Sequence, residues 1–432
     1  MEEKISSIKY KFSRFLRILG PGLITGAADD DPSGIATYSQ TGAQFGYSQL
    51  WMVIFMYPLM TAIQEACARI GAVTGKGIAA VVRDNYNKKI LYGVVFLVVI
   101  ANTINIGADI GAMASAINLI IPFPFAFFAL FFTAFVLILE IFTSYPKYAK
   151  ILKWLSLALL AYPITALIVG LNWGEVIRAT FIPHIELNFG FFFILTGVLG
   201  TTISPYMFFW QASEEVEEEI AQNRMLKGIP RISKRFLQNL RIDNAIGMLF
   251  SEIITWFIIV ATASVLNKHG ITNITSATEA AKALEPLVST FPHSGFLAKT
   301  LFASGVVGIG LLSVSVLAGS ASYALSEAFK WKEGLHLKLK QAHGFYGIII
   351  IATLIGLFIN FIGIDPIKAL VFAAVFNGVS AVPLIFLIGK IAGNKDIMGE
   401  YHSGWFSRTL VWTTFIVMLL SAVIMFAVIN RG

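Results

Sequence analysis

Hydrophobic residues in this chain fall in long continuous runs and do not alternate with polar residues. About 20 apolar residues are enough for a helix to cross a bilayer. We therefore predict eleven membrane-spanning helices, at 18–42, 48–70, 90–120, 123–142, 151–170, 191–212, 243–266, 296–328, 344–363, 366–389 and 408–429. A transmembrane β-barrel would instead show segments of about ten residues with alternating hydrophobicity. The pattern therefore indicates an all-α polytopic membrane protein.

The composition agrees with a protein that faces lipid. Hydrophobic residues make up 56% of the chain and charged residues 13%, whereas soluble domains carry about 25% charged residues. The first apolar run contains Asp29, Asp30 and Asp31, so we interpret it as a retained span and not as a cleaved signal. Cys67 is the one cysteine of the sequence, which excludes a disulfide framework and a thiolate metal cluster.

The basic residues are distributed unequally between the loops. If the N-terminus is cytoplasmic, nearly all of the 32 Lys and Arg residues lie on the inner side, as the positive-inside rule expects. The exceptions are Arg178, Lys268, Lys282, Lys299, Lys368 and Arg431. We predict a multi-pass protein of the inner (plasma) membrane, with a cytoplasmic N-terminus and an external C-terminus. The net charge of +7 is then a topology signal, and no nucleic-acid partner is expected.

The first span contains an unusual polar interruption. Residues 20–40 read GPGLITGAADDDPSGIATYSQ. A charged residue in mid-membrane costs at least about 2.5–3.5 kcal/mol, and Pro32 both lacks an amide proton and disfavours a helical Asp31. We predict an unwound segment at 29–34. Asp29 and Asp30 also fit a position at the membrane edge, facing water, but Asp31 lies too deep in the run for that.

The sixth span is interrupted in the same way, by Pro205 within GVLGTTISPYMFFWQASEE. Two discontinuous helices five spans apart indicate an inverted-repeat transporter with its site between the breaks. The repeats would cover 18–170 and 191–389, after a cytoplasmic N-terminus at 1–17 and before an eleventh helix at 408–429. The half-helix that leads into each break ends in unpaired carbonyls and the negative end of its dipole, so the site suits a cation.

At these residues the chain resembles the NRAMP family of divalent-metal transporters. The family's GPG is present as Gly20-Pro21-Gly22, and its DPGN motif as Asp31-Pro32-Ser33-Gly34. The stretches GAQFGYSQLW and ARIGAVTGKGIA continue the likeness after the first break. The resemblance implies a LeuT-type fold with a 5+5 inverted repeat, eleven spans, discontinuous helices 1 and 6, metal binding between those helices, and alternating access.

The chain departs from the family pattern at several ligand positions. Asp31 keeps the family's ligating aspartate, but Gly34 replaces its asparagine and Ser204 replaces its methionine. Thr201 stands where the family uses an alanine carbonyl, and Tyr206 and Gln211 stand where it has histidines. In the third span Asp109 has no matching glutamate three residues later. These departures resemble those of the NRAMP-related magnesium transporters.

The substitutions predict the ion. A hydroxyl at position 204 is a hard ligand, whereas a thioether favours soft metals, and Mg²⁺ keeps several of its waters, for which Gly34 would leave space. We predict uptake of Mg²⁺, and also Mn²⁺, as a partly hydrated ion without proton coupling, by a monomer that needs no cofactor and is not an enzyme. The metal-site candidates are Asp31, Asp30, Asp29, Ala28, Gly34, Thr201, Ser204, Tyr206, Gln211 and Asn377.

Some assignments stay open. Asn377 fits a cavity-facing role and a packing role equally well. Glu65 and Glu140 are expected in interfacial water, and the acidic run at 214–219 is expected to be a solvated face. One alternative is a proton-coupled Mn²⁺/Fe²⁺ transporter of ordinary NRAMP type, which the positions of the six histidines, in loops or at span ends, disfavour. Another is a LeuT-fold amino-acid or amine carrier, which the acidic triplet disfavours.

Overall fold

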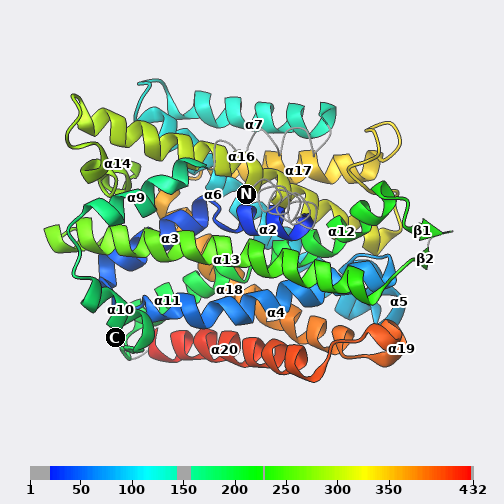
Figure 1. The fold of residues 1–432 in the computed structure, drawn as a ribbon. Coiled ribbons are helices and arrows are strands. Elements are labelled where there is room, and N and C mark those ends of the chain that lie inside the picture. Colours follow the sequence, from blue (N-terminus) through cyan, green and yellow to red (C-terminus); the bar gives the residue numbers. More distant parts are fainter. Residues whose placement is uncertain (1–19, 144–156, 227–228, 430–432) are drawn as a thin grey trace, which may run out of the picture.

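The computed structural model describes residues 20–143, 157–226 and 229–429, and this part is helical apart from one short ladder (Figure 1). Strands β1 (Met225–Leu226) and β2 (Ile229–Pro230) pair antiparallel. Among these described residues, eight segments are long and apolar enough to cross a membrane. They comprise α4 (Trp51–Thr74), α6 (Lys88–Asn118), α7 (Phe125–Phe142), α11 (Phe189–Thr202) with α12 (Pro205–Ala221), α13 (Lys234–Val265), α16 (Ser294–Phe329), α18 (Pro366–Ala392) and α20 (Trp405–Ile429).

Shorter helices lie at the other three predicted spans. The first span is divided into α2 (Pro21–Asp29) and α3 (Pro32–Phe45), the fifth is represented by η1 (Leu157–Leu160) and α9 (Ala161–Ile168), and the ninth is α17 (His343–Ile359). Predicted segments 1–17 and 151–156 lie outside the described residues. The total of eleven spans therefore stays a prediction. The connecting helices are α5 (Ile78–Asn85), α10 (Trp173–Phe181), η2 (Asn267–His269), α14 (Ala277–Lys282), α15 (Glu285–Val288), α19 (Lys395–Met398) and η3 (Gly399–Tyr401).

Both predicted helix breaks are present. The first is narrower than the predicted 29–34, because only Asp30 and Asp31 separate α2 from α3. Pro32 starts α3 in the first helical position, where its missing amide proton costs nothing and its φ angle suits a helix. Pro205 starts α12 in the same way, after Ile203 and Ser204.

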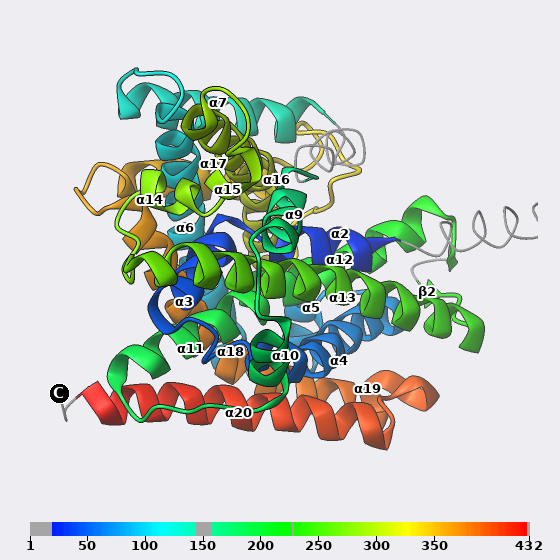
Figure 2. The ribbon, with the colours of Figure 1, turned by 60° about the vertical axis from the view of Figure 1, so that its left-hand side comes forward.

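Each broken helix packs on a helix of the other predicted repeat. Helices α2 and α3 pack on α13, which follows the second broken helix in the chain, while α12 packs on α4, which follows the first. Helices α6 and α16, the third spans of the two predicted repeats, pack on each other (Figures 1 and 2). This reciprocal packing is what an inverted repeat produces. The repeat boundaries themselves stay a prediction.

Glycines allow α2 to lie directly against α13. A Cβ atom on Gly26 would come within 2.3 Å of the Gly247 carbonyl, and one on Gly22 within 2.7 Å of the Asn244 amide nitrogen. Small residues four apart let helix backbones approach closely in membranes. The carboxylate of Asp243 accepts bonds from the Gly20 and Gly22 amides at 2.8 Å each, which caps the start of α2. These contacts fix the register of α2 on α13.

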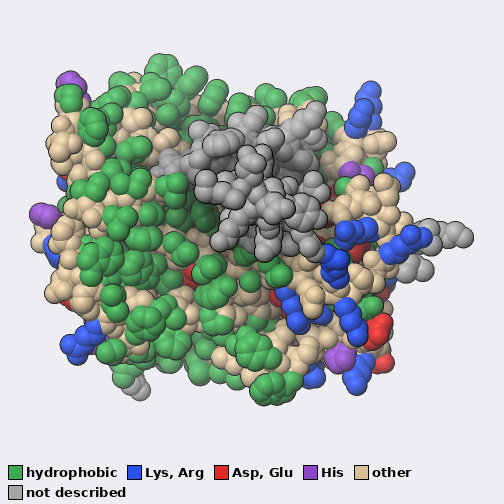
Figure 3. All heavy atoms as spheres, viewed as in Figure 1, with side chains coloured by type: hydrophobic (Ala, Val, Ile, Leu, Met, Phe, Trp, Pro, Cys, Tyr) green, Lys and Arg blue, Asp and Glu red, His purple; other side chains and the backbone are tan. Residues whose placement is uncertain are grey.

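The described part of the face shown in Figure 3 is largely apolar and is basic at one end. Figure 3 shows hydrophobic side chains across the middle of the viewed face, with Lys and Arg gathered at the end where β1, β2 and α19 lie. On α7, Phe127, Phe131 and Phe135 are exposed and stack along the helix. An exposed aromatic row of this kind suits contact with lipid.

Our prediction that several acidic side chains lie in water is wrong in part. Glu65 and Glu140 are each only 4% exposed. Glu65 is buried because it forms ion pairs with Arg69 and Arg241. In the run at 214–219, the side chains that are buried are Glu214, Glu215 and Glu219. They are buried because this turn of α12 packs against α4, α5 and α16 and does not end in solvent.

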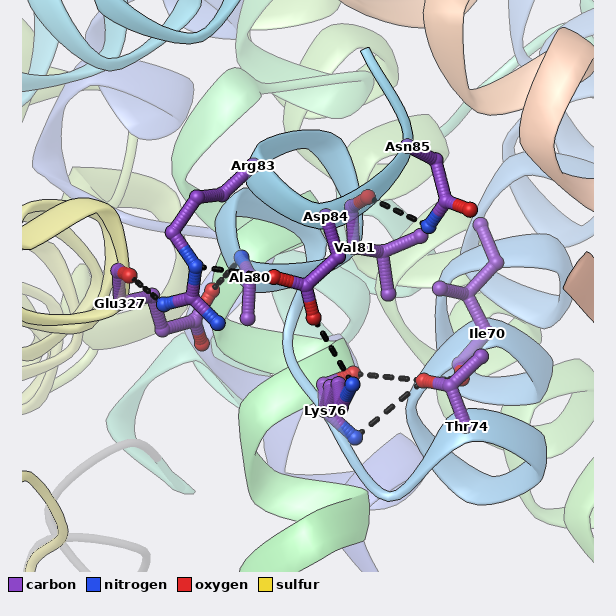
Figure 4. Close-up of polar contacts among 9 residues, drawn as sticks. All are labelled: Ile70, Thr74, Lys76, Ala80, Val81, Arg83, Asp84, Asn85 and Glu327. Atoms are coloured by element: carbon purple, nitrogen blue, oxygen red, sulfur yellow. Dashed lines mark hydrogen bonds and ion pairs between the residues drawn. The ribbon is translucent and has the colours of Figure 1, made fainter. Parts of the chain in front are cut away.

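At the basic end, α5 contacts α16. The Glu327 carboxylate accepts bonds from the Ala80 amide at 2.9 Å and from the Ser213 hydroxyl of α12 at 3.2 Å (Figure 4 shows the contact with Ala80). The Arg83 guanidinium donates to the Glu327 carbonyl. A Cβ atom on Gly77 would lie 1.8 Å from the carboxylate, so a larger residue there would displace the Glu327 side chain. One glutamate thus joins three helices at this end.

Candidate metal site

Asp31 occupies the first break and joins three helices. Its Oδ1 atom accepts bonds from the Ser33 hydroxyl at 2.6 Å and from the Gly34 amide at 2.7 Å, which caps α3. Its Oδ2 atom accepts a bond from the Asn105 amide of α6 at 2.8 Å. The Thr201 hydroxyl of α11 donates to Oδ1 at 3.4 Å. The carboxylate is therefore held in one orientation at the point where α3, α6 and α11 meet.

The second break brings hydroxyl oxygens to the same place. The Ser204 hydroxyl donates to the Gly200 and Thr201 carbonyls at the end of α11, at 2.6 and 2.7 Å. The Thr201 hydroxyl lies 3.2 Å from that of Ser33. Ser204 and Thr201 are both fully buried. Thr201 thus joins the second break to Ser33 and Asp31 of the first break.

The Ala28 carbonyl is covered by the phenol of Tyr206. The Tyr206 hydroxyl donates to the Ala28 carbonyl at 3.1 Å. The Tyr206 carbonyl in turn accepts a bond from Ser320 at 2.8 Å. A carbonyl oxygen has two lone pairs, so this bond leaves one lone pair of Ala28 for another partner.

The free space that we predicted beside Gly34 is absent from this arrangement. A Cβ atom at position 34 would lie 3.1 Å from the Tyr38 ring and 3.3 Å from the Thr201 hydroxyl. Both neighbours would have to move by a few tenths of an ångström. The expectation failed because Tyr38, one turn further along α3, and Thr201 of α11 already lie beside Gly34.

Asp29 and Asp30 are directed away from Asp31, toward α13. The Ser251 hydroxyl donates to Asp29 Oδ2 and, at 3.3 Å, to Asp30 Oδ1. Asp30 Oδ1 also accepts a bond from Thr255 at 3.3 Å. Asp29 is fully buried and Asp30 is 1% exposed, so neither is at a water-facing edge of the membrane, and that alternative is wrong.

Gln211 and Asn377 are buried polar side chains of α12 and α18. Gln211 accepts a bond from Thr25 of α2 at 2.5 Å and donates to Glu215 at 3.0 Å, so its amide joins α2 to α12. Asn377 is 1% exposed, and its Nδ2 atom has no hydrogen-bond partner among the described residues. No hydrogen bond within the described part of the chain joins either amide to Asp31.

Sequence reasoning missed Asn105. Its Nδ2 atom binds Asp31, and its Oδ1 atom is buried without a hydrogen-bond partner among the residues that the structure describes. One turn further along α6, Asp109 accepts a bond from Ser313 of α16 at 2.7 Å. The spacing of Asn102, Asn105 and Asp109 puts them on one face of a helix. That polar stripe in an apolar run was the available signal.

The cluster of side chains at the two breaks is closed to solvent. Asp31, Thr201, Ser204 and Tyr206 are fully buried. Within the described ranges, no group of three His, Cys, Asp or Glu side chains is arranged to hold a metal ion. None of the six histidines is buried. The arrangement therefore offers an ion one carboxylate together with hydroxyl, carbonyl and amide oxygens.

Comparisons with known proteins agree on the type of protein. Residues 22–428 match the family model "Natural resistance-associated macrophage protein-like" (Nramp). The "Divalent metal cation transporter MntH" of Caldanaerobacter subterraneus is 26% identical over 423 residues, which is 96% of this chain and 94% of that protein.

Solved structures show the same fold. The Eremococcus coleocola manganese transporter, in complex with an aromatic bis-isothiourea substituted compound, superimposes with a TM-score of 0.76 at 16% identity, covering 96% of this chain and 86% of that one. Mhp1, a nucleobase-cation-symport-1 family transporter, gives a TM-score of 0.58 at 13% identity, covering 96% and 93%. The second likeness identifies the LeuT-type arrangement of helices.

Proposed function

Because this chain belongs to the Nramp family, we propose that it takes up Mg²⁺, with Mn²⁺ as a second substrate, as a partly hydrated ion and without protons. The coarser function follows from the family: it is a multi-pass membrane protein that transports divalent metal cations, and it is not an enzyme. What we propose beyond this is the identity of the ion, its hydration, its binding site and the driving force of uptake. We also propose that the protein acts as a monomer.

The choice of ion rests on one observation: Ser204 supplies a hydroxyl at the second break, bonded to the Thr201 carbonyl, and the Thr201 hydroxyl in turn donates to Asp31. All three contribute oxygen to the cluster between the breaks, and Ser204 stands where the resemblance places a methionine sulfur. A thioether favours soft metals over Mg²⁺, and an all-oxygen site removes that preference. Mn²⁺ also accepts oxygen ligands, so it is expected as a second substrate.

Partial hydration is supported by the small number of charged ligands. Asp31 is the carboxylate that binds groups from both breaks, and Ala28, Thr201, Ser204 and Tyr206 would add neutral oxygens. Mg²⁺ requires six oxygens in an octahedron and gives up its waters reluctantly. Waters would complete the octahedron. Because the cluster is closed in this structure, we propose that water enters when the helices around it move apart during transport.

The absence of proton coupling is supported by the residues of α6. Asp109 is the acid of that helix, and Ala112 stands where the resemblance expects a glutamate. A divalent ion entering a cell gains about 4.6 kcal/mol per 100 mV, at about 2.3 kcal/mol for each of two charges. The membrane potential alone can therefore drive accumulation. In this direction of transport, the basic end of the molecule is cytoplasmic.

A proton-coupled Mn²⁺/Fe²⁺ transporter is the second candidate. The printed names of the relatives, a divalent metal cation transporter and a manganese transporter, favour it. So does Asp109, whose Oδ1 atom is buried without a hydrogen-bond partner in the described part of the chain. The amino-acid carrier, a third candidate, is opposed by Asp29, Asp30 and Asp31, which would repel a substrate carboxylate.

The test is transport by the purified full-length protein in liposomes at an imposed potential. One set contains a Mg²⁺-sensitive dye and the other a pH-sensitive dye. We expect Mg²⁺ and Mn²⁺ influx that increases with the potential, without acidification of the interior. Influx of Mn²⁺ with no influx of Mg²⁺, accompanied by acidification, would instead establish the second candidate.

A further inference from the structure

The three consecutive aspartates at the first break face two different sets of helices. Asp31 binds Asn105 of α6 and Thr201 of α11, whereas Asp29 and Asp30 bind Ser251 and Thr255 of α13. The backbone contact of Gly26 with Gly247 sets this register, because the next turns of both helices bring Asp29 and Asp30 to Ser251. A separate polar site thus exists between α2 and α13.

Glu252 of α13 completes this second site. It is 3% exposed, and neither of its carboxylate oxygens has a hydrogen-bond partner among the described residues. It directly follows Ser251, whose hydroxyl binds both Asp29 and Asp30. Asp29 Oδ1 is likewise buried and unpartnered within the described ranges. Buried carboxylates without partners are costly, and a missing water or ion is a usual explanation.

The charge balance points to a cation. Among the described residues, no ion pair involves Asp29, Asp30, Asp31 or Glu252. One divalent ion at Asp31 would neutralise two of the four negative charges. Two negative charges would then stay buried beside each other, which is unfavourable unless protons or a second cation compensate them.

Unpartnered polar groups continue from this site along α4. The Tyr57 hydroxyl of α4 donates to the Ala245 carbonyl of α13 at 3.1 Å. Two turns further along the same face of α4 lies Gln64. Gln64 is fully buried, and both of its amide atoms are without partners in the described part of the chain. Groups of this kind suit a path that is filled with water when the transporter opens.

We propose that Asp29, Asp30 and Glu252, together with the hydroxyls of Ser251 and Thr255, form a second site for a hydrated divalent cation on the α2 side of Asp31. The site extends the proposed function, on which it rests. No three of the described carboxylates converge closely enough to ligate a bare ion. These groups therefore hold the ion through its water shell, which Mg²⁺ keeps more readily than other ions. The ion reaches this site from Asp31 and leaves along α4.

The experiment titrates Mn²⁺ into the detergent-solubilised full-length protein and records electron paramagnetic resonance spectra, in which two neighbouring Mn²⁺ ions broaden each other's signal. The wild type should bind two Mn²⁺, with broadening as the second site fills. Glu252→Gln should bind one Mn²⁺ without broadening, and the affinity of the first site should be retained. Ser251→Ala should weaken the second site about 10-fold or more, as for loss of an outer-shell partner.

Control variants separate this proposal from its premise. Ser264→Ala removes a hydroxyl of α13 that binds only carbonyls of its own helix, and it should bind two Mn²⁺ as the wild type does. Asp31→Asn should lose the first ion. If Asp31→Asn bound the first Mn²⁺ as tightly as the wild type, the proposed function would be refuted. That result would leave the second site untouched.

Three outcomes would overturn the second site. One is a wild type that binds a single Mn²⁺ at every pH, because protons then neutralise the remaining carboxylates. Another is two bound ions in Glu252→Gln. The third applies if Glu252→Gln does not elute as a folded protein, in which case Ser251→Ala is the deciding variant. If Ser251→Ala then binds two Mn²⁺ with the same affinities as Ser264→Ala, the second site is refuted.

Discussion

The side-chain amide of Asn105 donates to Asp31 Oδ2 at 2.8 Å, and this bond ties the middle of α6 to the break between α2 and α3. The two residues are 74 positions apart in the chain. In the predicted repeat, α6 is the third span and packs on α16, while α2 and α3 pack on α13. The bond therefore joins two groups of helices that must move relative to each other if access alternates.

Replacing Asn105 should weaken metal binding. Asn105→Ala removes the donor that orients Asp31, and losing an outer-shell partner typically costs about 10–100-fold in metal affinity. Titration calorimetry with Mn²⁺ measures the change. The matched control is Asn102→Ala, because Asn102 donates to the Leu317 carbonyl and not to Asp31. Equal affinities in both variants would show that Asn105 does not support the site.

Replacing Asp31 should abolish uptake of Mg²⁺ and Mn²⁺. Asp31→Ala removes the charge and also the cap of α3, which contributes about 1 kcal/mol to helix stability. Asp31→Asn keeps a good cap and removes only the charge. Both variants should fold and fail to transport in liposomes. Asp365→Asn, at the cap of α18, is the control and should transport normally. Retained binding in Asp31→Asn would remove this residue from the site.

A thioether at position 204 should shift selectivity toward soft metals. Ser204→Met, combined with Gly34→Asn, should raise affinity for Mn²⁺ and Cd²⁺ and lower it for Mg²⁺. Because Tyr38 and Thr201 crowd position 34, Gly34→Asn alone should lower the melting temperature, and the measurement should therefore include Ser204→Met alone. A double variant with the metal ranking of the wild type would show that ligand hardness does not set selectivity.

Proton movement should not accompany transport. In liposomes held at a fixed potential, Mg²⁺ or Mn²⁺ influx should leave the internal pH unchanged, and Asp109→Asn should not alter this result. Ser313→Ala removes the hydroxyl that binds Asp109 and serves as a second variant. Metal-dependent acidification that disappears in Asp109→Asn would show that this carboxyl carries a proton with the metal.

The link between His336 and Glu217 should make stability depend on pH. The hydrogen bond to Glu217 raises the pKa of His336 above its ordinary value, although partial burial opposes the shift. A raised pKa in the folded state means that the link stabilises fully below about pH 6.5 and that its contribution is lost as the pH rises through the folded value. His336→Gln should therefore lower the melting temperature at about pH 6 and have little effect at about pH 8.

The matched control for this prediction is His343→Gln, at the exposed start of α17. It should lower the melting temperature by a similar small amount at both pH values. An equal effect of the two histidine variants at both pH values would contradict a specific role for the bond with Glu217.

The sequence by itself determined where the chain crosses the membrane and where two crossings are interrupted. Long apolar runs predict helices because a helix satisfies its own backbone hydrogen bonds in lipid. Pro32 and Pro205 predict the breaks because proline interrupts a helix within its own segment. These effects are local, so one segment is enough to reveal them. The family resemblance added the candidate ligand positions Asp31 and Ser204 and the LeuT-type fold.

Only the tertiary structure decided which way the acids point and what surrounds them. In an unwound segment, neighbouring side chains have no fixed periodicity, so the order Asp29, Asp30, Asp31 does not reveal that two face α13 and one faces α6. The partners lie far away in the chain: Ser251 is 221 positions from Asp30. Their meeting depends on the close approach of Gly26 and Gly247, which is a property of two packed helices and cannot be derived from either helix alone.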